Sequence, residues 1–114
     1  MDEISALLLT KALDGLAMRA TATSQNIANA NSPGYQPLRV TFEERLREAS
    51  NSGREAIRAV HPEYVHATPQ DGEPALRLDL EMATASQTAL RYAALVDVLN
   101  RQMQIARLTV RGGQ

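Results

Sequence analysis

The stretch Ser24–Gln36, SQNIANANSPGYQ, marks the point at which a long helical pattern stops. Pro33 has no amide hydrogen to donate and cannot continue a helix. Pro33 and Gly34 together suit a type II turn, because glycine readily adopts the positive φ that this turn requires after proline. We therefore expect a helix that ends near Asn31, with Asn31 as its cap, followed by a tight turn.

Two further asparagines, Asn26 and Asn29, lie inside the helical pattern, where asparagine is a poor helix former. With Gln25 beside them they form a polar edge that can both donate and accept hydrogen bonds. Buried amides of this kind fix the register between packed helices. The pattern therefore indicates specific helix packing, and it has none of the features of a catalytic site.

Between the N-terminus and Ala30, residues that form one stripe recur at alternating steps of three and four. Only one member of the stripe, Thr23, is polar. The stripe consists of Ala6, Leu9, Leu13, Leu16, Ala20, Thr23, Ile27 and Ala30. This spacing keeps all members on one side of a helix and is typical of coiled coils, so it predicts a helix over residues 1–31.

A second stripe with the same spacing lies near the C-terminus and predicts a helix over residues 79–114. Its members are Met82, Ala85, Ala89, Tyr92, Val96, Leu99, Met103, Ala106 and Val110. We predict a mainly α fold in which the two long helices pair as a coiled-coil-like hairpin. The segment between them, residues 32–78, completes a single structural domain.

Apolar residues also lie outside both stripes, so a two-helix hairpin cannot bury all of them. They are Ile4, Leu7, Leu8, Ala17 and Met18 in the first helix, and Leu90, Ala94, Leu95, Val98, Ile105 and Leu108 in the second. Charge is concentrated elsewhere: residues 1–30 and 80–110 hold five charged side chains each, whereas residues 31–79 hold fourteen. We expect other chains to cover the helices.

The middle segment is rich in proline and glycine and is expected to be irregular. One short helix is predicted where Thr41–Glu44 forms a capping box ahead of the apolar stripe Phe42, Leu46 and Ala49. Ala56–Val60 is compatible with a short strand. Thr68–Pro74 is predicted to form a turn-rich loop, and Asp79 is predicted to be the N-cap of the second long helix.

Composition excludes several functions. The net charge of −1 argues against nucleic-acid binding, and the absence of cysteine excludes disulfides and thiolate chemistry. The chain has no apolar run long enough for a membrane span, and its acidic start (Asp2, Glu3) is unlike a cleaved secretory signal. His61 and His66 lack a third metal ligand. We expect no enzyme activity, no cofactor and no metal.

Ser24-Gln-Asn-Ile-Ala-Asn-Ala-Asn-Ser-Pro-Gly-Tyr35 closely resembles the N-terminal signature, ANNIANxxTPGY, of the bacterial flagellar rod, hook and hook-associated axial proteins. Gln25 stands where the family usually has asparagine. Within the family, Leu90-Arg-Tyr92 and the short middle segment are similar to the small proximal rod proteins, whereas larger members insert domains between the helices.

The resemblance implies a structural subunit that passes through the flagellar type III export channel without a cleaved signal. It would assemble with copies of itself, with other rod proteins and with the basal-body base and export gate, in the rod that crosses the periplasm. The expected interface residues are Leu9, Leu13, Leu16, Gln25, Asn26, Ile27, Asn29, Asn31, Pro33, Gly34, Tyr35, Tyr92, Val96, Leu99, Met103 and Val110. Off-stripe apolar residues would lie between subunits, with Asn26 and Asn29 setting their register.

Two alternatives remain open from the residues alone. A helical-hairpin binding module, such as a small export chaperone or regulator, would be a folded and discrete dimer. A metal-dependent enzyme at His61 and His66 would contain stoichiometric metal.

Overall fold

The computed structural model describes residues 1–69 and 74–112. In chain order the elements are α1 (Glu3–Ala28), β1 (Leu38–Thr41), α2 (Glu43–Ser50), α3 (Arg54–Arg58), β2 (Glu63–His66) and α4 (Leu78–Gly112). The predicted fold class is confirmed: two long helices pack on each other and flank a middle segment with short helices and a small sheet.

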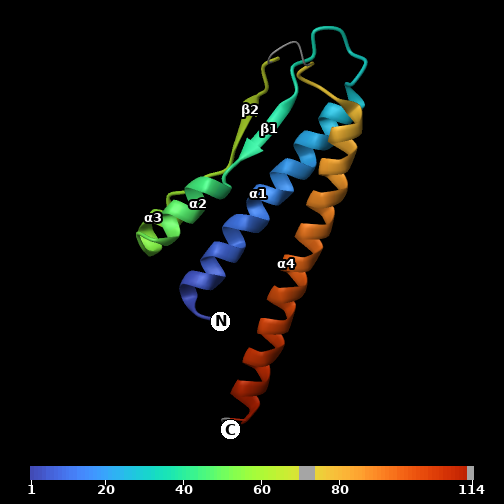
Figure 1. Cartoon of the computed structure of the whole chain (residues 1–114). Coiled ribbons are helices and arrows are strands. Elements are labelled where there is room, and N and C mark those ends of the chain that lie inside the picture. The colour runs from blue at the N-terminus through green and yellow to red at the C-terminus, as the bar shows by residue number, and fades with distance from the viewer. Residues whose placement is uncertain (70–73, 113–114) are drawn as a thin grey trace.

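Helix α1 occupies the centre of the molecule. Helix α4 runs antiparallel along one side of it, and β1, β2, α2 and α3 lie on another side (Figure 1). Both chain ends therefore lie at the same end of the hairpin, and α4 continues past the start of α1 (Figure 1). The molecule is elongated, with a longest dimension of 63 Å.

Local hydrogen bonds set the ends of α1. At the start, the backbone N–H of Ser5 donates to Oδ1 of the N-cap residue Asp2 at 2.6 Å. At the other end, the prediction that Asn31 is the cap is wrong, because α1 ends at Ala28 and Asn29 is its C-cap. Both the backbone N–H of Asn29 and its side-chain amide donate to the carbonyl of Gln25, at 3.0 and 2.9 Å, which closes the last turn early.

The predicted turn after the helix is present. The N–H of Tyr35 donates to the carbonyl of Ser32 at 3.2 Å, and Gly34 has a φ of 75°. This positive φ is what a type II turn requires of the residue that follows Pro33.

The capping box predicted at Thr41 is wrong. Thr41 is the last residue of β1, the N-cap of α2 is Phe42, and no side chain caps this helix. Thr41 pairs with Glu63 across the sheet, which keeps it extended. The apolar stripe behind the box is confirmed, because Phe42, Leu46 and Ala49 are all buried.

The strand predicted at Ala56–Val60 is also wrong, because α3 occupies most of that segment. The helical turn directs the Ile57 side chain into the core, where it is fully buried. Lys11 of α1 then caps the end of α3: its Nζ donates to the carbonyls of Arg58 and Val60 at 2.9 and 2.7 Å. These bonds satisfy carbonyl groups that a helix end leaves free.

The small sheet is a single antiparallel pair in which Leu38 lies opposite His66 and Thr41 opposite Glu63. Helix α4 begins at Leu78, so Asp79 lies inside its first turn and is not the N-cap. The predicted loop Thr68–Pro74 lies partly outside the described residues.

The core is built without α4. It consists of Leu16, Ala22, Val40, Phe42, Leu46, Ala49, Ile57 and Val60. The buried residues of α4 are Glu81 and Thr88, both polar, and Leu95 of α4 packs only at the edge of the core. Within the described ranges, no helix combines the length and apolar character that crossing a membrane requires.

A close approach between α1 and Phe42 organises the centre of this core. The Phe42 ring lies directly on Gly15, so that a Cβ at position 15 would be 2.5 Å from ring atoms Cδ1 and Cζ. Glycine is unfavourable in a helix interior by about 1 kcal/mol relative to alanine. Here it leaves the space that the ring occupies.

Candidate assembly interface

Asn26 is the most constrained residue of the signature segment. It is 0% exposed. Its Nδ2 donates to the carbonyl of Leu38 at 2.9 Å, and its Oδ1 accepts from the N–H of Leu38 at 2.8 Å. The side-chain amide thus makes the two bonds that a residue of a neighbouring strand would make, and it closes the edge of β1 that faces away from β2.

The same amide joins two further segments. Oδ1 of Asn26 accepts from the Tyr35 hydroxyl at 2.8 Å, and Nδ2 donates to Oε2 of Glu81 at 3.0 Å. Asn26 therefore ties the signature turn, β1 and α4 to α1. The helix–helix contact expected of this amide exists, and it lies within one chain instead of on an outer surface.

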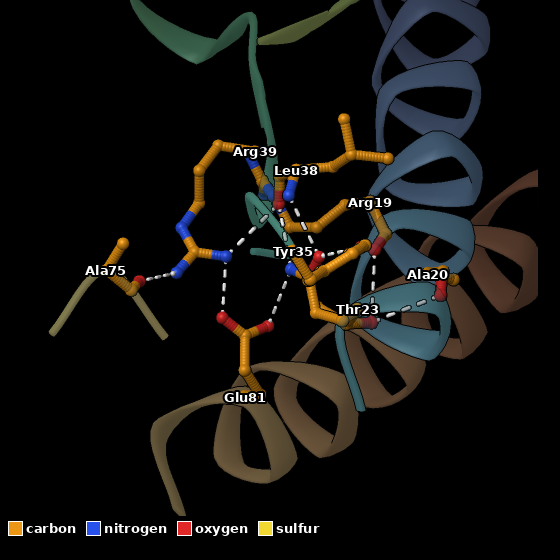
Figure 2. Close-up of polar contacts among 9 residues, drawn as sticks. Arg19, Ala20, Thr23, Tyr35, Leu38, Arg39, Ala75 and Glu81 are labelled. Carbon is orange, nitrogen blue, oxygen red and sulfur yellow. Dashed lines mark hydrogen bonds and ion pairs between the residues drawn. The ribbon is translucent and has the colours of Figure 1, made fainter. Parts of the chain in front are cut away.

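Glu81 is the partner on α4, and it is only 3% exposed. Figure 2 shows the guanidinium group of Arg39 between the Glu81 carboxylate and the main-chain oxygens of Leu38 and Ala75. Arg39 Nη1 lies 2.6 Å from Glu81 Oε1, and each bond to a main-chain oxygen is 3.1 Å long. A buried carboxylate needs such compensation, because an unpaired charge would be strongly destabilising.

A second ion pair joins α1 to α2. Arg19 donates two hydrogen bonds to Glu43, at 2.6 and 2.7 Å, and a third to the carbonyl of Val40 at 2.6 Å. The guanidinium carbon also lies 5.2 Å from the centre of the Phe42 ring, a favourable cation–π distance. Arg91 of α4 lies 3.7 Å from the same Glu43 carboxylate.

The hydrogen bonds from Arg19 lower the pKa of Glu43 below its ordinary value of 4.5. A carboxylate with a lowered pKa stabilises the fold above its unfolded-state pKa, and this contribution is lost as the pH falls through the folded-state pKa. We expect Glu43→Gln to be less stable than the parent near neutral pH, with the difference shrinking below pH 4.5. Urea unfolding followed by circular dichroism across that range measures the difference.

The matched control is Glu44→Gln. Glu44 is the neighbouring carboxylate, and its partner Arg47 is as exposed as itself. Exposed pairs contribute little to stability, so this variant should follow the parent at every pH. Equal pH dependence of the Glu43→Gln and Glu44→Gln variants would contradict the role assigned to the Arg19–Glu43 pair.

The stripe of α4 that faces the rest of the molecule is shifted by one residue in its first half. Glu81, Thr88 and Leu95 are buried or half-buried at seven-residue intervals, whereas the predicted positions Met82 and Ala89 are exposed. The bonds from Glu81 to Asn26 and Arg39 turn this residue inward in place of Met82. The rotation of α4 about its axis therefore follows the polar bonds of Glu81 and not the apolar pattern of the sequence.

The sixteen residues expected at the interface fall into three groups by exposure. Leu9, Leu16 and Asn26 are buried within the chain. Leu13, Ile27, Asn29, Tyr35, Val96 and Leu99 are half-buried, whereas Gln25, Asn31, Pro33, Gly34, Tyr92, Met103 and Val110 are exposed. The structure brings Asn26 and Tyr35 into direct contact, and the exposed members are spread over the signature turn and α4.

A separate apolar surface of α4, which we call the outer stripe, consists of Leu90, Ala94, Val98, Ile105 and Leu108. Its four larger members are 73%, 42%, 54% and 66% exposed in chain order. Leu90 is two residues from the buried Thr88, or about 200° around the helix, so the outer stripe points away from α1. It is an apolar face that no other described residue of the chain covers.

Sequence reasoning missed four residues that hold the structure together: Gly15, Arg19, Arg39 and Glu81. One signal was available for Gly15, because an isolated glycine inside a helical pattern often marks a close approach. The other three are charged residues whose partners are distant in sequence; Arg39 and Glu81, for example, come together only when α4 docks.

His66 is the last residue of β2, whereas His61 lies two residues before the strand begins, and both side chains are exposed. Among the described residues, no three histidine, aspartate or glutamate side chains are grouped closely enough to hold a metal ion.

No family model matches the chain, and no curated protein matches it.

Proposed function

We propose that this chain is a structural subunit of the bacterial flagellar proximal rod. In this proposal it reaches the rod through the flagellar export channel and assembles with copies of itself, with other rod proteins and with the basal-body base. The observation that carries the proposal is the outer stripe, in which Leu90, Ile105 and Leu108 are each more than half exposed. The signature at Ser24–Tyr35 adds the resemblance to axial proteins.

The physical argument concerns what an exposed apolar stripe does in water. Burying it is favourable by about 25 cal/mol per Å² of apolar surface. A stripe that extends along most of a long helix can be covered by another helix over its whole length. In a tube of packed helices, the helices of neighbouring subunits can cover the stripe of each subunit.

The buried network supports the same proposal from inside the chain. Asn26 and Arg39 hold α1 and α4 in one register through Glu81. A subunit of a regular assembly has to present the same surfaces in every copy. A polar lock on the helix pair meets that requirement, because a slipped register would leave Glu81 buried without its partners.

The experiment is electron cryotomography of basal bodies in a strain that lacks only this chain. We expect rods to be absent and to return when the chain is expressed again. The neutral control is complementation with the Gln36→Ala variant, whose substitution is at an exposed position outside both stripes. Normal rods in the deletion strain would overturn the proposal, and a search for the partner of a helical binding module would follow.

A further inference from the structure

We draw no further inference here: the strongest candidate, the exposed apolar surface that the outer stripe forms along α4, is covered by no other described residue of the chain, and nothing in the structure shows what covers it.

Discussion

Replacing Asn26 by leucine is expected to lower the free energy of unfolding by about 3 to 5 kcal/mol, among the largest effects of any single change in this chain. Leucine is similar in size but makes no hydrogen bonds. The substitution would leave the N–H and carbonyl of Leu38, the Tyr35 hydroxyl and one oxygen of Glu81 without their present partner. Each unsatisfied buried group costs about 1 to 3 kcal/mol.

Urea unfolding at neutral pH measures this effect. The matched control is Gln25→Leu, which removes the neighbouring amide at an exposed position and should change stability by no more than about 0.5 kcal/mol. If Asn26→Leu were as stable as the control, the network would not hold the hairpin together. The result also bears on assembly, because any defect of Asn26→Leu there would follow from a loosened subunit and not from a lost contact between subunits.

Gly15→Ala is expected to destabilise the chain by about 2 kcal/mol, although alanine is the better helix former. The new methyl group would overlap the Phe42 ring, since even the ring atoms Cδ1 and Cζ lie only 2.5 Å from the ideal Cβ position. The ring cannot move away freely, because it is buried in the core and has the Arg19 guanidinium over its face. Overpacking outweighs the gain in helix propensity.

A double-mutant cycle tests this explanation. Phe42→Leu alone should destabilise the core by leaving a cavity. In the Phe42→Leu background, Gly15→Ala should lose its penalty and become neutral or stabilising. Additive losses in the double variant would show that the cost of a side chain at position 15 does not come from the ring.

Local patterns predicted the elements well where one signal dominated. The two long helices, the turn at Pro33–Gly34 and the stripe Phe42, Leu46 and Ala49 all follow from residue spacing or from glycine's conformational freedom. Short elements were less predictable. Residues 56–60 form part of a helix because Ile57 reaches the core and Lys11 caps the helix end, and both partners are distant in sequence.

The candidate site was predictable in its residues but not in their roles. Asn26 and Tyr35 stand out in the sequence, and the structure brings them into hydrogen-bonding contact. The bonds of Asn26 to Leu38 and to Glu81 could not be anticipated, because an apolar stripe offers no reason to turn a glutamate inward. The rotation of α4 follows from the ion pair of Glu81 with Arg39, whereas the apolar periodicity selects a stripe one residue away, about 100° around the helix.

Because α4 contributes none of the eight core residues, two copies of the chain could exchange this helix. The eight core residues belong to α1, β1, α2 and α3 or the short segments that join them. Removing α4 would therefore take none of these eight residues away. It would remove the packing of α4 along α1, the contact of Leu95 with the edge of the core, and the bonds made by Glu81 and Arg91. The same bonds could be made by the α4 of another chain, since the residues that α4 contacts are identical in every copy. Helix α4 is thus the natural element for domain swapping, in which two chains exchange equivalent helices and each recovers the contacts it gave up.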